Sequence, residues 1–138
     1  MNQTIDMRFI RYLNLFERVS RVSSKHCFFY NNFVIFVVPS FLVSKAIGRN
    51  GENVRTLMSI MNKRIKIISQ PEGVDETKNF ISEIIKPIQV KNIQITGEEI
   101  VISADKQSRA ILIGRNKIKL EELKKIVEEY FSKKLRIN

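Results

Sequence analysis

A tetrad bracketed by glycines, Gly48-Arg49-Asn50-Gly51, is the stretch of this sequence whose residue types could do chemistry. Two glycines spaced by two residues let a backbone turn sharply and let a partner approach without a Cβ in the way. The segment after the tetrad reads as a helix, and the N–H groups of a helix N-terminus favour an anion. A loop of this kind, with a basic residue inside it, suits a phosphate backbone. The spacing alone is a weak signal, because any tight turn between helices can use it.

The chain repeats this tetrad 66 residues later as Gly114-Arg115-Asn116-Lys117, with lysine in place of the last glycine. An alignment at this offset needs no gaps from Phe33 to Leu57, and apolar residues fall on apolar residues. Repetition of motif and order together indicates a tandem duplication.

The first loop must be positioned by the elements around it, which apolar periodicity predicts. They follow the order helix, strand, strand, helix, helix and strand, over residues 4–20, 24–30, 33–38, 39–47, 52–61 and 63–68. Thr4 suits the cap of the first helix and Asp6 its first turn. Asn31-Asn32 joins the two strands, since Asn tolerates positive φ in a tight turn.

The same order begins again after a segment rich in Pro and Gly, residues 69–74, which we interpret as a linker. The predicted elements of the second half are residues 75–86, 90–96, 99–103, 106–113, 117–132 and 135–137. We therefore expect two small domains, residues 1–70 and 71–138.

The 138 residues carry 24 Lys and Arg against 14 Asp and Glu, a net charge of +10. This balance favours a nucleic-acid partner, or less often an anionic membrane surface. The plainer alternative is a basic protein from a proteome rich in Lys and Ile. The most apolar run, residues 27–43, is too broken by Asn, Pro and Ser to span a bilayer, so no membrane partner is expected.

Catalytic and metal chemistry find little support in the sequence. A single His26 and a single Cys27 allow neither an intrachain disulfide nor a usual metal site, and the lack of disulfides suits a reducing cytoplasm. No nucleophile with a paired base and no Walker loop is visible. We expect a binding protein rather than an enzyme, with no cofactor and no metal.

The order αββααβ around Ile47-Gly48-Arg49-Asn50-Gly51 resembles a KH domain of type II topology. Two such modules with a short linker are similar to the archaeal-type NusA family of transcription termination and antitermination factors, as is the segment Arg11–Glu17. The resemblance implies an α+β fold of two tandem KH domains, each with a three-stranded sheet packed against helices. It also implies single-stranded RNA as partner and a role near transcription, which makes RNA polymerase a candidate partner. We expect a cytoplasmic monomer.

A KH groove holds about four unpaired nucleotides, and its GxxG loop clamps their backbone. By this resemblance Gly48, Arg49, Asn50 and Gly51 form the clamp. Lys45 and Arg55, one turn to either side, could contact phosphates or could simply lie on solvated helix faces. The apolar floor under the bases would come from Val43, Ala46, Ile47 and Val54. Ile47 could equally belong to the core.

The second module, with Gly114, Arg115, Asn116 and Lys117, departs from the family pattern. A lysine side chain stands where the RNA backbone would come closest, which puts the second clamp in doubt. Charge agrees, because residues 1–70 hold 11 basic and 3 acidic residues while residues 71–138 hold 13 and 11. Our hypothesis is that the first module is the principal RNA clamp and the second extends or braces it.

Two other functions remain open at this point. One is a KH adaptor in ribosome assembly or RNA decay, and the other is a KH scaffold with little RNA binding. For the aromatic residues Phe33 and Phe36, core packing is the main interpretation and stacking on a base is the alternative.

Overall fold

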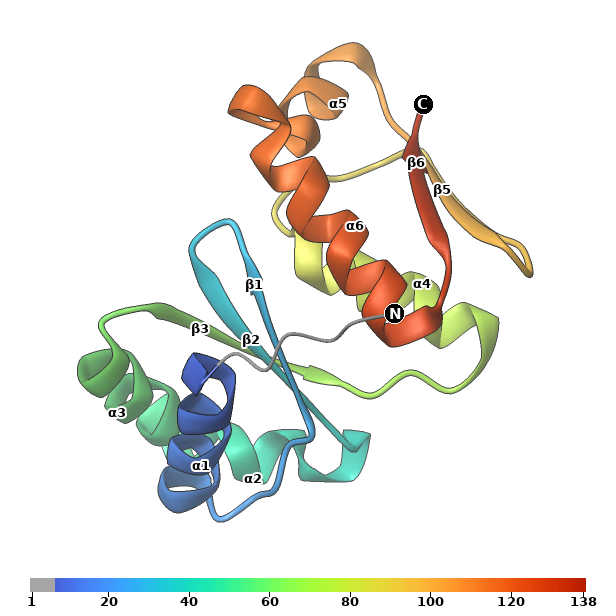
Figure 1. The fold of residues 1–138 in the computed structure, drawn as a ribbon. Coiled ribbons are helices and arrows are strands. Elements are labelled where there is room, and N and C mark those ends of the chain that lie inside the picture. The colour runs from blue at the N-terminus through green and yellow to red at the C-terminus, as the bar shows by residue number, and fades with distance from the viewer. Residues whose placement is uncertain (1–6) are drawn as a thin grey trace. The chain divides into compact units, whose positions relative to one another are not determined.

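The computed structural model describes residues 7–138 and is mixed α+β, as predicted (Figure 1). Two three-stranded sheets are present in these residues. The chain divides into two compact units, Met1–Gln70 and Pro71–Asn138. The predicted helix cap at Thr4 and first-turn Asp6 lie outside the described residues.

The first unit has the element order predicted from periodicity. Its helices and strands are α1 (Met7–Ser20), β1 (His26–Tyr30), β2 (Phe33–Val38), α2 (Val43–Ile47), α3 (Glu52–Met61) and β3 (Arg64–Ser69). β2 is the central strand, antiparallel to β1 and parallel to β3. The expected helix over residues 39–47 is instead a 3-10 turn, Ser40–Leu42, followed by the short α2.

The tight turn between β1 and β2 lies at Asn31-Asn32, as predicted. Both residues have positive φ, 52° and 64°. Paired left-handed residues match the twist of the flanking strands, and Asn accepts this conformation better than most residues. The turn therefore fixes the register in which Tyr30 lies opposite Phe33.

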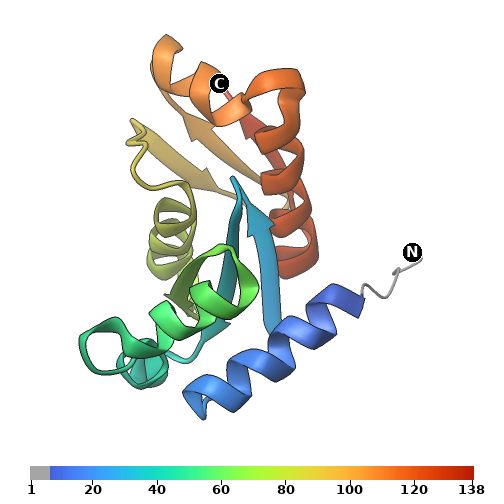
Figure 2. The same cartoon turned by 90° about the vertical axis from the view of Figure 1, so that its left-hand side faces the viewer.

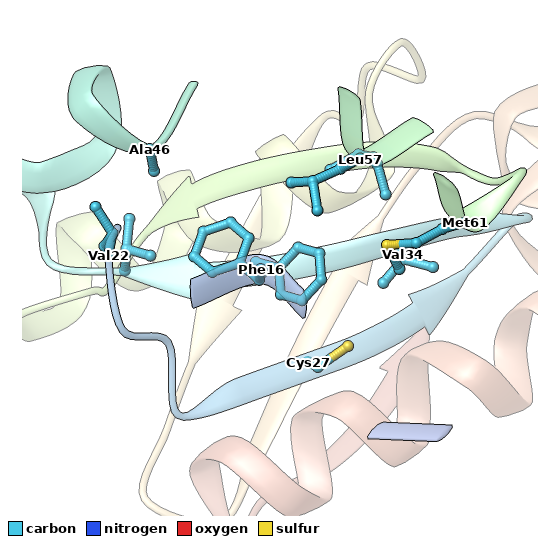
Figure 3. Close-up of a cluster of buried hydrophobic side chains, with 10 residues drawn as sticks. Phe16, Val22, Cys27, Val34, Ala46, Leu57 and Met61 are labelled. Atoms are coloured by element: carbon cyan, nitrogen blue, oxygen red, sulfur yellow. The ribbon is translucent and has the colours of Figure 1, made fainter. Parts of the chain in front are cut away.

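The core of the first unit lies between its helices and one face of its sheet (Figures 1 and 2). Phe16 of α1 is fully buried and stacks on Phe36 of β2 with ring centroids 4.3 Å apart. In Figure 3, Ala46 and Leu57 point from the helices toward the strands that carry Cys27 and Val34. Burial of aromatic and aliphatic side chains of this size contributes roughly 1.5–3 kcal/mol each.

This core decides between the two interpretations for Phe36, one of the two aromatic residues in question. Phe36 has no exposed surface, so it cannot stack on a base, and its predicted core role is confirmed. Phe33 is half-buried on the opposite face of the sheet. The Arg64 guanidinium carbon and Lys66 Nζ lie 4.4 and 4.7 Å from its ring centroid. Such cation–π contacts stabilise this corner of the sheet by about 0.5–1 kcal/mol each.

The second unit repeats the order helix, strand, strand, helix, helix and strand. Its elements are α4 (Gly73–Ile85), β4 (Asn92–Ile95), β5 (Glu99–Ser103), α5 (Lys106–Ile113), α6 (Ile118–Phe131) and β6 (Lys134–Ile137). β5 is central, antiparallel to β4 and parallel to β6, so both sheets share one topology. The arrangement of each unit is consistent with the predicted type II KH fold.

Candidate nucleic-acid interface

The first GxxG loop joins α2 to α3 through a single 3-10 turn, Arg49–Gly51. Three of its residues have positive φ: 84° at Gly48, 55° at Asn50 and 74° at Gly51. The Gly51 amide donates a hydrogen bond of 3.1 Å to the Gly48 carbonyl, which closes the turn. Only Gly and Asn adopt such angles at low cost, so the residue types and the loop shape agree.

Gly48 is required by close packing as well as by its φ. A Cβ placed there would lie 2.9 Å from Cγ of Asn53, well inside van der Waals contact. The Asn53 side chain fills this space and donates a hydrogen bond of 3.2 Å from Nδ2 to the Lys45 carbonyl. Asn53 therefore ties the first turn of α3 to the last turn of α2 across the loop.

Arg55 braces the same loop from its other end. Its guanidinium Nη1 donates to the carbonyl of Asn50. The same nitrogen lies 3.4 Å from the position that a Cβ on Gly51 would take, which is ordinary contact. The sequence left Arg55 open between a phosphate contact and a solvated helix face, and the structure places its guanidinium against the loop backbone.

The N-terminus of α3 faces the loop without a side-chain cap. Gly51 occupies the N-cap position and makes no side-chain hydrogen bond there. The first N–H groups of a helix have no partner within the helix and carry a partial positive charge. Glu52, in the first turn of α3, opposes an anion there, whereas the exposed Lys45 and Arg49 favour one.

The predicted apolar floor needs one correction. Ala46 has no exposed surface and packs in the core, so it cannot lie under a bound base. An alanine in the middle of a short amphipathic helix takes the inward face because the helix packs closely on the sheet. Val43, Ile47 and Val54 are half-buried, and Val43 and Val54 pack against the core from its edge. These three side chains retain surface beside the loop.

The second loop has the same backbone shape as the first, although lysine replaces its last glycine. Gly114, Asn116 and Lys117 have φ of 75°, 56° and 60°, and the Lys117 amide donates to the Gly114 carbonyl at 3.2 Å. Lys117 adopts the left-handed conformation that Gly51 adopts in the first loop. The two loops therefore share one backbone path. The difference that the sequence indicated for the second clamp lies in the side chain of Lys117.

The side chains around the second loop differ from those around the first. Lys119 stands in place of Asn53, and its Cγ lies 3.0 Å from where a Cβ on Gly114 would be. Glu121 stands in place of Arg55 and approaches Lys124 at 3.9 Å, with both side chains exposed. Ile111 replaces Lys45 and is 41% exposed. The second loop is thus surrounded by less positive charge and by more apolar surface.

Sequence reasoning missed Asn53 as a residue of the site. The signal was present, since an amide side chain in the first turn of a helix can bond back to the preceding backbone. The spacing of Asn53 from Gly48, five residues, gives no hint that the two touch. The contact depends on the turn folding α3 back against α2.

The described part of the chain holds neither of two other kinds of site. None of its helices has the length and apolar character needed to cross a membrane. Residues 7–138 bring together no group of three or more His, Cys, Asp or Glu that could hold a metal ion.

Comparison with known proteins gives three relatives that carry one name, "Probable transcription termination protein NusA". The relative from Halococcus morrhuae is 25% identical over 134 residues, which are 95% of this chain and 94% of that protein. The relative from Methanocaldococcus jannaschii is 30% identical over 122 residues, 86% of this chain and 65% of that protein. The relative from Methanococcus vannielii is 27% identical over 92 residues, 65% of this chain and 51% of that protein.

Among solved structures, the crystal structure of APE1850 is similar to this fold with a TM-score of 0.65. It covers 97% of this chain and all of that chain, at 19% sequence identity. At this identity the likeness concerns the fold alone. No family model matches the chain.

Proposed function

Because these relatives confirm the resemblance to the archaeal-type NusA family, we propose that the protein binds single-stranded RNA during transcription termination or antitermination. One observation carries the RNA-binding part of this proposal. Two GxxG-type loops with matching backbone angles occur at the same place in two units of the same topology. A loop of that shape before an uncapped helix N-terminus suits a phosphate backbone.

In this proposal the two units are tandem type II KH domains, residues 1–70 and 71–138, and neither is an enzyme. The first clamp uses Gly48, Arg49, Asn50 and Gly51, with the exposed Lys45 as an additional phosphate contact. Bases lie on the half-buried Val43, Ile47 and Val54. Arg55 serves mainly to hold the loop, because its guanidinium donates to the Asn50 carbonyl.

The first loop is the principal clamp and the second the weaker one. Arg115 and Asn116 are exposed, as Arg49 and Asn50 are, and the backbone of Gly114 matches that of Gly48. Lys117 offers a charge where Gly51 offers close approach. Ile111 and Glu121 stand in place of Lys45 and Arg55, whereas Lys117 and Lys119 add cations at other positions. Glu121 and Glu122 then leave the second loop with the lower net charge, in a half of the chain whose charges nearly cancel.

Titration of a fluorescent single-stranded RNA tests this ranking. Gly51→Asp puts a carboxylate at the first loop, where the nearest atom to the new Cβ lies 3.4 Å away and the φ of +74° strains any residue with a side chain. It should lose at least about tenfold in affinity, or 1.4 kcal/mol. Gly114→Asp should lose less. Equal losses would contradict the ranking, and circular dichroism of both variants checks that they fold.

Two alternatives predict other results. A KH scaffold with little RNA binding predicts that the unaltered protein fails to bind, or binds without the salt dependence of phosphate contacts. An adaptor in ribosome assembly or RNA decay predicts crosslinks mainly to ribosomal precursors or decay intermediates. The transcription role predicts crosslinks to nascent transcripts and recovery of RNA polymerase with the protein. Crosslinking followed by RNA sequencing separates the last two functions.

A further inference from the structure

A groove of about 550 Å³ lies between α1 and α3 of the first unit. Its apolar lining comes from Met7, Ile10 and Leu15 of α1 and from Ile60 and Met61 of α3. These two helices lie side by side on the sheet (Figures 1 and 2). The two longest helices of this unit therefore form the sides of the groove.

Three of the apolar side chains that line this groove are exposed. Met7 is 70% exposed, Ile10 is 43% exposed and Ile60 is 57% exposed. Single exposed apolar residues are common, but a contiguous group of them marks an interaction site. Met7 adds a flexible thioether side chain, which adapts to the surface of a partner, whereas Met61 is buried in the core beneath the groove.

Positive charge lies along the same groove. Arg11 and Arg18 line it together with Asn14, and two helical turns separate the arginines on one side of α1. A second hollow continues past Arg18 to Arg21, and Glu17 is the one acidic residue among the residues that line the two hollows. A ligand that fills this groove must combine an apolar stripe with negative charge.

The chemistry of the lining favours a protein helix over RNA. Nucleic-acid bases stack on aromatic side chains. The groove is lined by one aromatic side chain, Tyr12, which is half-buried and makes an edge-to-face contact with Phe29. Aliphatic side chains between two parallel ridges accept a third helix well. The groove also lies near the C-terminal end of α3, roughly 12 Å of helix away from the loop at its N-terminus.

We propose that the groove between α1 and α3 binds an amphipathic helix of a partner protein that presents acidic residues to Arg11 and Arg18. The apolar stripe of the partner covers Met7, Ile10 and Ile60. Because this surface is distinct from the GxxG loop, RNA and the partner helix bind at the same time. The inference stands on the groove and does not depend on the proposed RNA function.

A designed probe tests this proposal on the full chain. The probe is a helical peptide of about 18 residues with leucine on one stripe and glutamate elsewhere, titrated into protein with labelled Ile and Met methyl groups. We expect saturable shifts of the Met7, Ile10 and Ile60 methyl signals, while Ile111 and Ile118 of the second unit stay unchanged. Ile60→Glu and Arg11→Glu should each weaken peptide binding at least about tenfold.

Matched controls make the result specific. Val74 is 55% exposed on α4, so Val74→Glu adds the same charge at an equally exposed apolar site and should leave peptide binding intact. RNA binding should be unaffected by Ile60→Glu. No methyl shifts, or equal binding of a peptide with lysine in place of glutamate, would overturn the proposal. Competition by single-stranded RNA for the same methyl groups would assign the groove to RNA instead, and shifts on dilution alone would assign it to a second copy.

Discussion

Lys117 changes the side chain at the last position of the second loop but leaves the backbone conformation there unchanged. Its backbone has φ 60° and ψ 21°, close to the 74° and 19° of Gly51. A residue with a Cβ adopts this region at a cost of about 1–2 kcal/mol, whereas glycine does so at no steric cost. The second unit therefore keeps a strained residue in order to keep the loop shape.

Lys117→Gly should stabilise the protein by about 0.5–1 kcal/mol, because relief of backbone strain exceeds the extra chain entropy that glycine gives the unfolded state. Urea unfolding followed by circular dichroism measures the change. The matched substitution Gly51→Lys introduces the same strain into the first loop and should destabilise by a similar amount. Destabilisation by Lys117→Gly would show that Lys117 does not adopt the left-handed conformation.

Asn53 links α3 to α2 through the hydrogen bond that its side chain donates to the Lys45 carbonyl. We expect Asn53→Ala to loosen the first loop, because it removes the link between α3 and the carbonyl end of α2. The expected result is faster hydrogen exchange of the Gly48 and Gly51 amides, by about five- to tenfold for a lost bond of about 1 kcal/mol. Lys119→Ala is the matched control, since Lys119 fills the corresponding space beside Gly114 with the carbon atoms of its side chain. Unchanged exchange in Asn53→Ala would mean that the turn holds itself.

The residue types of the two loops could be predicted from sequence, but their surroundings could not. The tetrad identified Gly48 and Gly51 through their conformational freedom, which is a local property. The clash that a Cβ on Gly48 would make with Asn53, and the brace from Arg55, depend on how α3 returns against α2. The burial of Ala46 likewise follows from helix–sheet packing, which periodicity in a five-residue helix cannot report.

At the scale of elements, the two helices that precede the loops differ at their N-termini: α5 has a side-chain cap and α2 has none. The Asp105 carboxylate accepts a hydrogen bond of 2.7 Å from the Ser108 amide, as an N-cap does. The hydrogen bond from Ser108 to the charged form, with a smaller contribution from Lys91, lowers the pKa of Asp105 below its ordinary value of 3.8. α2 begins after a 3-10 turn and has no side-chain cap at Leu42.

The sign of this pKa shift predicts how the start of α5 responds to acid. Because the folded pKa is lowered, the cap stabilises the helix fully above the ordinary value of 3.8, and its contribution is lost as the pH falls through the folded pKa. An NMR titration should show the Ser108 amide signal moving with a midpoint below 3.8. Asp105→Asn should abolish this movement. A midpoint at or above 3.8 would mean that the cap does not form in solution.

Element boundaries were predictable where the signal is local. Helix α3 was predicted with its observed ends, and the turn at Asn31-Asn32 lies where the turn residues indicated. Helix α4 begins at Gly73, two residues before its predicted start at Asp75. Two hydrogen bonds explain this: Glu72 N–H donates to Glu76 Oε1, and Thr77 Oγ1 donates to the Gly73 carbonyl. Pro71 and Gly73, separated by one residue, indicated a linker, and these two hydrogen bonds draw Gly73 into the helix.

At the scale of the whole molecule, each unit is small enough that one core residue decides its stability. Phe16 is fully buried and stacks on Phe36. Phe16→Ala should cost about 3–5 kcal/mol, which is comparable to the entire stability of a small domain. We expect loss of the dispersed NMR signals of residues 7–70, with circular dichroism showing reduced structure. Phe41→Ala, at a phenylalanine that is 81% exposed, should leave both unchanged.

The two halves of the chain differ in net charge. Residues 1–70 carry 11 basic and 3 acidic residues, and residues 71–138 carry 13 and 11, although the two loops have one backbone shape. Binding of single-stranded nucleic acid weakens with salt in proportion to about 0.7 times the number of phosphates neutralised. If the first loop is the principal clamp, its cations must contribute most of this dependence.

The double variant Lys45→Gln with Arg49→Gln should therefore lower the slope of log affinity against log salt by up to about 1.4, the value for two phosphate contacts. The matched double variant Arg115→Gln with Lys117→Gln removes the same charge from the second loop and should lower the slope by less. Titrations at four or more salt concentrations measure both slopes. A larger change in the second variant would reverse the ranking of the clamps, and it would mean that the charge of Lys117 outweighs the close approach that Gly51 allows.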